Sequence, residues 1–152
     1  MADLYPALAL GDCLDEAQGV IVNVKAESLV TKGQVVVWNT HTSGQIGSVS
    51  PAGVGAKNVA GVALKTIAAS ECGPILQKGC VKVTGSGAIT IGSKIASGAA
   101  GVVAASAALD APATYAEATM QTELDKIEAR IGMAMQTFAG GDTGLVFIDC
   151  VR

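Results

Sequence analysis

Side chains able to do acid–base or nucleophilic chemistry are few and dispersed in this sequence. The only histidine, His41, lies between Thr40 and Thr42 in a polar stretch, which favours a solvated loop residue over a catalytic base. No serine stands in the G-x-S-x-G pattern that presents a nucleophile at a strand-to-helix turn. Without a paired base and nucleophile, the sequence predicts that the protein is not an enzyme.

The thiols and carboxylates do not form a recognisable metal site. The four cysteines form no C-x-x-C pair, and a single histidine makes a Cys/His site improbable. No D-x-D-x-D calcium loop is present, so a solvated acidic surface is expected. Free cysteine behaves as a small apolar residue, so we expect buried, reduced thiols at Cys80 and Cys150, and a cytosolic origin disfavours a disulfide. The other thiols and carboxylates that could coordinate a cation, but show no ligand spacing, are Cys13, Cys72, Asp12, Asp15, Glu16, Asp110 and Glu117.

Two other features suggest a cofactor only weakly. The glycine-rich stretch TGSGAITIGS (Thr84–Ser93) contains neither G-x-G-x-x-G nor a P-loop, and it lies between strand-like segments instead of opening a helix. Lys32, Lys65 and Lys78 could carry a lipoyl or biotinyl group at a turn, but none has the hydrophobic-flanked turn of such carriers. We therefore expect no cofactor and no metal.

Composition indicates one domain of many short strands. The chain has 152 residues, long enough for one core, and half of them are hydrophobic, mostly Ala, Val, Ile and Leu. Its 19 glycines suit tight turns. A net charge of −3 with scattered lysines and arginines predicts binding to neither nucleic acid nor membranes. No long apolar run and no signal-peptide pattern are present, so we expect a soluble protein made in the cytoplasm.

The most informative feature is an internal repeat. VAGVALKTIAASECGPILQKGCVKV (Val59–Val83) resembles RIGMAMQTFAGGDTGLVFIDCVR (Arg130–Arg152). With Gly61 aligned to Gly132, the match continues without a gap for thirteen positions. The turn at Gly92-Ser93 corresponds to the turn at Lys32-Gly33, and the second half carries about 12 more residues before Gly132. The identical pairs are Gly61/Gly132, Ala63/Ala134, Thr66/Thr137, Ala68/Ala139 and Gly73/Gly144.

Periodicity predicts the elements of each half. VIVNVKA, from Val20, alternates apolar and polar residues as a strand does, and in the next strand Val35 and Val37 share one face while Val36 and Trp38 share the other. PILQKG and CVKVTG are expected as two further strands, the first opened by Pro74. In the extra segment of the second half, Thr114 with Glu117 forms a capping box that predicts a helix over about 113–130. The apolar positions of that helix are Ala116, Met120, Leu124, Ile127 and Ile131.

The expected fold is mainly β. Residues 1–19 read as an extended N-terminal arm, and residues 20–152 as a single β-rich domain made of two related halves, about 29–83 and 90–152. Each half has too few strands to close a core alone, so two halves packed together should bury their shared apolar faces. The body is therefore predicted as a duplicated small barrel or sandwich with one inserted helix.

The order of these patterns resembles the phage capsid cement, or head-decoration, proteins. A K-G turn and β run precede G-V-A-L-x-T-x-A-x-x-x-x-G-P-I-L-x-x-G-x-V-x-V, then A-I-x-x-G-S-K-I, then I-G-M-A-M-x-T-x-A-x-G-D-T-G-L-V-x-I. The resemblance covers roughly Leu29 to Arg152. The helical insertion at 112–130 departs from the family pattern, which leaves its role open.

The resemblance implies a structural role in the virion. Such proteins bind the outside of an icosahedral head after the shell expands, often as homotrimers, and clamp the major capsid protein. An arm commonly makes the contact, and here that role would fall on Leu4, Tyr5, Pro6, Leu8 and Leu10. The expected location is the outer capsid surface. Two other classes stay open: a non-enzymatic β-rich binding module for a small ligand or glycan, and, last, an enzyme on a small β-barrel.

Overall fold

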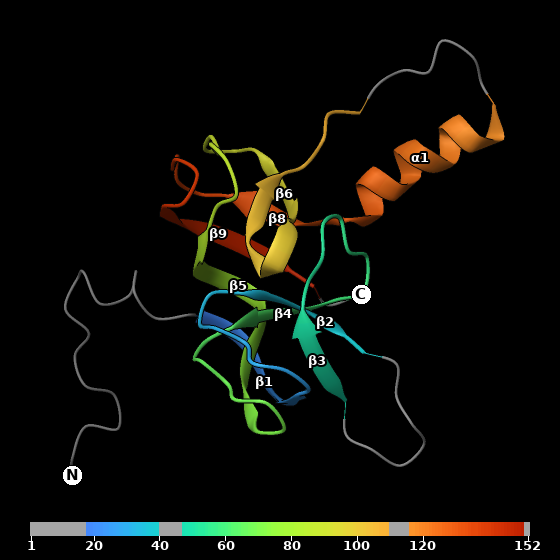
Figure 1. The fold of residues 1–152 in the computed structure, drawn as a ribbon. Coiled ribbons are helices and arrows are strands. Elements are labelled where there is room, and N and C mark those ends of the chain that lie inside the picture. The colour runs from blue at the N-terminus through green and yellow to red at the C-terminus, as the bar shows by residue number, and fades with distance from the viewer. Residues whose placement is uncertain (1–17, 40–46, 110–115, 151–152) are drawn as a thin grey trace.

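The computed structural model describes residues 18–39, 47–109 and 116–150, and they form a mainly β protein with one α-helix (Figure 1). Short apolar runs broken by glycine turns produce the short strands, as the composition predicts. The strands are β1 (Gln18–Ala26), β2 (Val35–Trp38), β3 (Ser48–Pro51), β4 (Val59–Ala63), β5 (Cys72–Thr84), β6 (Lys94–Ser97), β7 (Val103–Ala105), β8 (Arg130–Ala134) and β9 (Thr143–Asp149). The 3-10 turn η2 (Ala99–Gly101) and the helix α1 (Glu117–Glu128) complete the order.

The strands form two rings that share β5. In the first ring the order β1-β3-β2-β4-β5 closes on itself, because β1 pairs with β3 in parallel and with β5 in antiparallel register. In the second ring the order β5-β9-β8-β6-β7 closes through a parallel bridge between Gly85, just after β5, and Val103 of β7. Figure 1 shows the rings stacked one above the other, with β5 passing between them.

Hydrogen bonds recur at the positions that the sequence alignment pairs. Gly33 and Gly92, both at φ 84°, donate their N–H groups to Ala63 O and Ala134 O, each at 2.8 Å. Glycine suits these turns because the left-handed region is costly for other residues. The other equivalent contacts are Lys32 N to Thr66 Oγ1 at 3.3 Å, Ile91 N to Thr137 Oγ1 at 3.0 Å, and the bridges Val30–Ile67 and Ile89–Phe138.

Each ring encloses its own apolar interior, and the alternation predicted for β2 is confirmed. Val36 and Trp38 belong to the cluster inside the first ring. Val35 and Val37 point outward and join the cluster that fills the second ring. One strand therefore supplies both cores, since successive side chains point to opposite faces.

Three boundaries differ from the prediction. PILQKG and CVKVTG are a single 13-residue strand, β5, because Gly79 at φ 136° stays in the sheet and pairs with Gly19 and Ile148 instead of making a turn. Pro74 accordingly lies inside β5, opposite Asn23, and does not open a strand. β1 begins at Gln18, two residues before the expected start of the domain.

The inserted helix exists but is shorter than predicted. α1 spans Glu117–Glu128, and its N-cap is Ala116, which makes no side-chain capping hydrogen bond. The Thr114–Glu117 capping box is therefore wrong, because Glu117 is the first helical residue and not the third. The sheet resumes at Arg130, which leaves Ile131 in β8 with 3% of its surface exposed.

Candidate functional site

The residues whose side chains could act in catalysis or bind a metal or cofactor do not come together at one site in the described structure. Among residues 18–39, 47–109 and 116–150, no group of three His, Cys, Asp or Glu side chains is placed to hold a metal ion. Lys32 and Lys65 are exposed on turns, whereas Lys78 lies within β5, with its Nζ 2.8 Å from Asp149 Oδ2. Glu117 is exposed at the start of α1. His41, Cys13, Asp12, Asp15, Glu16 and Asp110 lie outside the described residues.

The cysteines are less buried than predicted. Cys72 is exposed, and Cys80 and Cys150 are partly exposed. Cys80 points away from the second ring's interior because it alternates with the buried Val81, and its Sγ lies 3.5 Å from Met135 Sδ. The glycine-rich stretch 84–93 leads into β6 and not into a helix, so it does not present a helix N-terminus to a phosphate.

The candidate contact residues of the arm, Leu4, Tyr5, Pro6, Leu8 and Leu10, also lie outside the described residues. The arm joins the body at β1, whose N-terminal end pairs with the middle of β5 through Gln18–Cys80 and Gly19–Gly79. A methyl group added at Gly19 would lie 1.7 Å from Lys78 O, so the chain enters the body through a tight backbone contact. The attachment point is therefore fixed at the junction between the rings.

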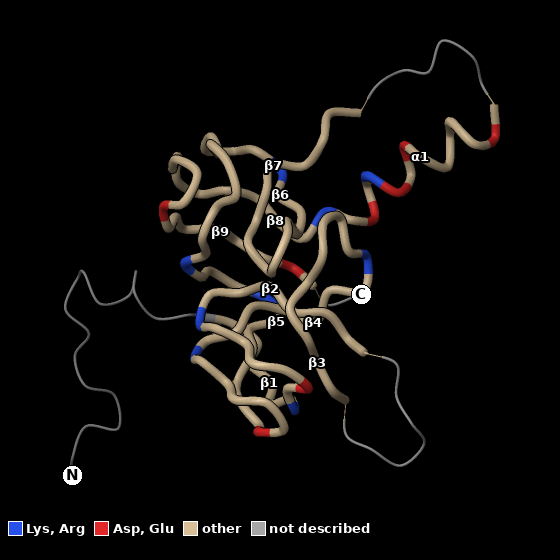
Figure 2. The backbone as a smooth tube through the Cα atoms, viewed as in Figure 1, with Lys and Arg blue, Asp and Glu red and all other residues tan. Residues whose placement is uncertain are grey.

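The helix α1 carries a surface that the sequence did not identify. It projects from the body (Figure 1), and its charged residues are conspicuous in Figure 2. The side of α1 that faces the body carries small or polar side chains. Thr122, Asp125 and Ala129 line a hollow of about 420 Å³ there, together with residues of β6 and β7. The apolar positions lie on the opposite side, where Met120, Leu124 and Ile127 are 44%, 49% and 46% exposed.

The apolar side of α1 is thus turned outward, the reverse of an ordinary surface helix. The spacing of 4 and 3 residues places Met120, Leu124 and Ile127 in one stripe. No residue of α1 is buried. The predicted period is confirmed for Met120, Leu124 and Ile127, whereas Ala116 precedes the helix and Ile131 belongs to β8. Within the described chain, the apolar side of α1 supplies no core packing.

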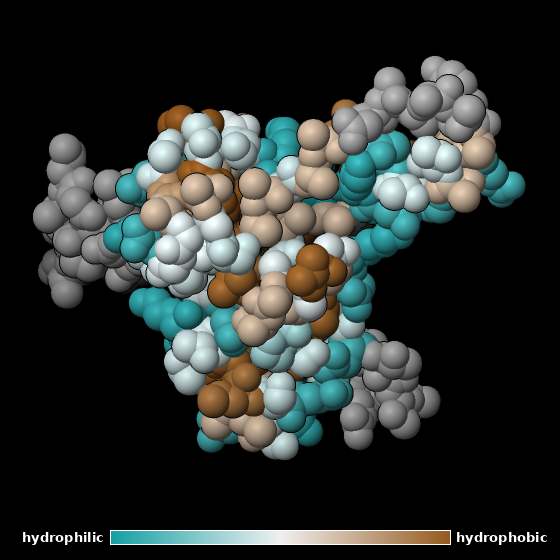
Figure 3. Space-filling model, turned by 45° about the horizontal axis from the view of Figure 1, so that its top comes forward, coloured by the Kyte–Doolittle hydropathy of each residue, from teal (hydrophilic) through white to brown (hydrophobic). Residues whose placement is uncertain are grey.

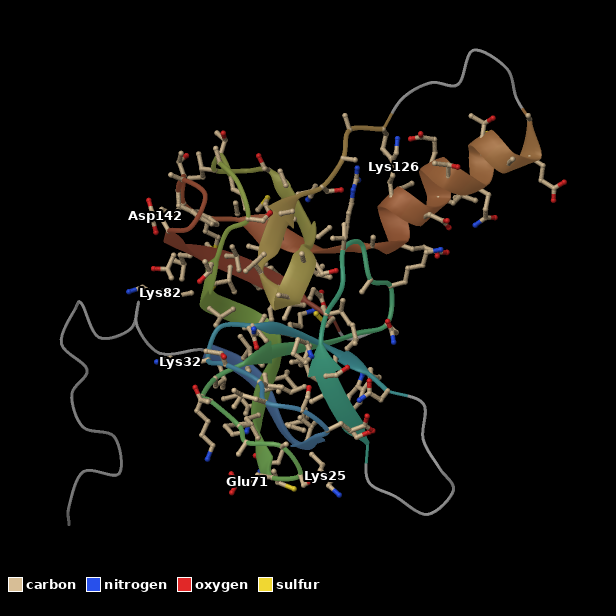
Figure 4. The ribbon with its side chains drawn as sticks, viewed as in Figure 1. Lys25, Lys32, Glu71, Lys82, Lys126 and Asp142 are labelled. Carbon is tan, nitrogen blue, oxygen red and sulfur yellow. The ribbon has the colours of Figure 1, made fainter. Side chains whose placement is uncertain are left out.

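Ion pairs hold the C-terminal part of α1 against the first ring. Lys57 contacts Asp125 and lies 3.3 Å from Glu128 Oε2. Lys126, labelled in Figure 4, donates from its Nζ to Ala108 O at 3.3 Å. The hydrogen bond from Lys57 lowers the pKa of Asp125 below its ordinary value of 3.8, aided by a hydrogen bond from Gln121. The same contact raises the pKa of Lys57. These charges are exposed, so they orient α1 more than they stabilise the fold.

Replacing Lys57 by Met should loosen α1 without unfolding the rings. We expect amide exchange over residues 117–128 to accelerate several-fold, while the melting temperature stays close to that of the original protein, because exposed ion pairs add little to global stability. Hydrogen exchange measured by mass spectrometry reports both regions. Lys65→Met, on a turn of the first ring, is the control, and equal protection of α1 in both variants would contradict the anchoring role.

Acid should release the same contact. The pKa of Asp125 is lowered in the folded protein. The stabilising contact of its carboxylate with Lys57 is therefore fully present above pH 3.8 and is lost as the pH falls through the lowered pKa. An NMR titration of the Asp125 carboxyl group should give a pKa below 3.8 that rises toward the ordinary value in Lys57→Met, where only the weaker contribution of Gln121 remains to lower it. An unchanged titration in the variant would refute the assignment.

Two other hollows among the described residues are small or shallow. Trp38 borders a hollow of about 190 Å³ with Lys57, Asn58 and Asp149, smaller than the roughly 300–1,000 Å³ of a ligand pocket. A shallow hollow of about 570 Å³ lies over β8 and β9, beside Lys94, Met133 and Phe147. Figure 3 shows apolar patches between polar ones on the face in view. Within the described residues, each of these hollows has at most one aromatic side chain in its lining.

Comparison with solved structures finds a related fold. The N base of the head fiber protein gp8.5 of bacteriophage phi29 superposes with a TM-score of 0.59. The match covers 86% of this chain and 94% of that one, at 16% sequence identity. At this identity the likeness establishes the fold alone. No protein-family model matches the chain, and no curated protein matches it in sequence. Within the described residues, no helix is long and apolar enough to cross a membrane.

Proposed function

We propose that the protein is a structural component of a phage virion that binds the outside of the icosahedral head and stabilises the capsid lattice. The observation that carries the proposal is the fold, which the chain shares over most of its length with the base of a phage head fiber. The sequence supports it independently through the resemblance to head-decoration proteins over Leu29 to Arg152. A protein with this role needs surfaces for contact and no catalytic constellation.

The major capsid protein is the proposed partner, and the N-terminal arm is the proposed contact. The arm has an apolar character that a groove of the shell can bury, through Leu4, Tyr5, Pro6, Leu8 and Leu10. The protein acts as a homotrimer made in the host cytoplasm. Several weak contacts on neighbouring capsid subunits then combine into tight binding.

The alternative role, a binding module for a small ligand or glycan, is less well supported. Glycan sites use aromatic side chains to stack on the sugar, and Trp38 borders a hollow of only about 190 Å³. The larger hollow beside α1 is lined chiefly by Ala, Ser and Thr side chains. The hollow of about 570 Å³ over β8 and β9 is shallow, and Phe147 is the one aromatic side chain that lines it. None of these three hollows combines an enclosed volume of that size with an aromatic wall.

Co-sedimentation with expanded empty heads of the phage that encodes the chain tests the proposed function. We expect the purified protein to pellet with expanded heads at a fixed ratio to the capsid subunit and to remain in the supernatant with unexpanded heads. Lysozyme or another unrelated protein of similar size serves as the control for trapping. Binding to neither kind of head would refute the proposal.

A further inference from the structure

One face of the first ring is covered by the second ring. Val35, Val62 and Leu76 form a row across β2, β4 and β5, with Val35 opposite Val62 and Val62 opposite Leu76. All three point out of the first ring, yet they are 0% exposed, because they join the apolar cluster that fills the second ring. Polar contacts border this junction: Gln34 Nε2 to Ala100 O at 2.9 Å, Gly55 N to Ser97 O at 2.8 Å and Gly101 N to Ala52 O at 2.9 Å.

The equivalent row of the second ring is open. The alignment that pairs Gly33 with Gly92 and Gly61 with Gly132 places Lys94, Met133 and Phe147 at the positions of Val35, Val62 and Leu76. The strand pairing is the same, with Lys94 opposite Met133 and Met133 opposite Phe147. Met133 is 38% exposed where Val62 is fully buried, and a hollow of about 570 Å³ lies over the row. We call Lys94, Met133 and Phe147 the open row.

An arrangement of stacked units that ends on an exposed apolar row lacks its next neighbour. In repeat proteins each unit buries the face of the one before it, and the last unit needs either a polar cap or a partner. Here the last ring keeps Met133 and Phe147 in the row, with the exposed Met135 nearby in sequence, so it is only partly capped. What fits such a row is visible within the chain itself, because the second ring already covers the equivalent row of the first.

We propose that the open row binds a second copy of this chain, with the second ring of one copy receiving the first ring of the next. The inference deepens the proposed homotrimer by naming the surface and its head-to-tail direction, and it rests on that self-association. A head-to-tail contact joins two different surfaces, so copies related by a closing rotation form a ring with no free end. Three copies would give a closed ring of six related units.

The residues that differ between the two rows fit a contact between separately folded copies. Lys94 and Arg130 stand where the first ring has Val35 and Val59. Charged side chains are kept at the border of interfaces that must also face water before assembly, whereas a permanent core is more apolar. The covered row within the chain has the apolar character, and the open row has the mixed one.

Site-specific photo-cross-linking tests the proposal. A benzophenone amino acid is placed at Met133 and, as a matched control, at Ile91, which is 62% exposed on a turn outside the open row. We expect covalent dimers and trimers from position 133 and at least ten-fold less product from position 91. Mass spectrometry should map the attachment points to residues 18–76 of the other copy. Attachment to the other copy's own open row, or no product between copies in concentrated solution, would overturn the proposal.

A substitution gives a second measurement. Met133→Lys should convert a species of three times 15.1 kDa to a monomer by light scattering, while Ile91→Lys leaves the mass unchanged. Circular dichroism checks that both variants fold. If Met133→Lys stays trimeric but no longer binds heads, the row contacts the shell and the inference is wrong while the proposed function stands. If the original protein is a trimer that cross-links through position 133 but never binds heads, the open row joins copies of the chain and the proposed function is wrong.

Discussion

A protein lacking residues 1–17 is expected to fold and to lose binding to expanded heads. The deletion ends directly before β1, so every described strand and the β1–β5 pairing remain. The lost segment carries all five proposed contact residues of the arm. In the proposed role several arms bind one lattice together, so their joint removal should weaken the apparent affinity for heads by about a hundred-fold or more. Circular dichroism and light scattering check the fold and the mass, and co-sedimentation measures binding.

A second variant separates the arm's chemistry from its length. Leu4→Ser, Leu8→Ser and Leu10→Ser together should reproduce most of the deletion, since they remove the apolar area and keep the backbone. Asp12→Asn, Asp15→Asn and Glu16→Gln together form the matched control and should bind nearly normally. Full occupancy by the deleted protein would show that the body alone makes the capsid contact.

Gly61→Ala and Gly132→Ala are expected to destabilise the fold by about 3 kcal/mol or more. A methyl group at Gly61 would lie 2.3 Å from Leu76 O, and one at Gly132 would lie 2.0 Å from Phe147 O. Gly61 also has φ 155°, which other residues rarely adopt. The obstacle is backbone of a paired strand in both cases, so relief requires the sheet to move. Urea unfolding followed by circular dichroism measures the change.

Gly53→Ala is the matched control for these glycines. Gly53 has no heavy atom within 4 Å of an added methyl group, and its φ is not in the left-handed region. We expect a change within about 0.5 kcal/mol. A similar loss in all three variants would mean that general glycine content, and not the close strand contacts, limits stability.

Patterns with a short period predicted most of the fold. The two faces of β2, the turns at Gly33 and Gly92 and the helix in the second half follow from alternation, glycine and helical spacing. Element ends were predicted less well. Gly79 looks like a turn in sequence, but Gly19 opposite it allows close backbone approach and keeps β5 continuous. The capping box failed because the helix begins later than Thr114 would require.

The exposed apolar surfaces were harder to predict because the burial of a residue depends on neighbours that are distant in sequence. Met120, Leu124 and Ile127 form a helical stripe in sequence, and nothing in that stripe says that it faces outward. The open row is a clearer example, since Met133 and Val62 are both apolar and occupy equivalent strand positions, yet Val62 is covered and Met133 is 38% exposed. The one sign of this difference in the sequence is that the second half has Lys94 at the position that Val35 occupies in the first half.

Cryo-electron microscopy of intact virions tests whether the protein lies on the outside of the phage head. Heads from the phage that encodes the chain should be compared with heads from a mutant lacking its gene. We expect additional density on the outer capsid surface, at three-fold or quasi-three-fold positions, into which the two-ring body with its projecting α1 fits. Identical outer surfaces in the two maps, or density confined to the inside of the shell, would contradict the account.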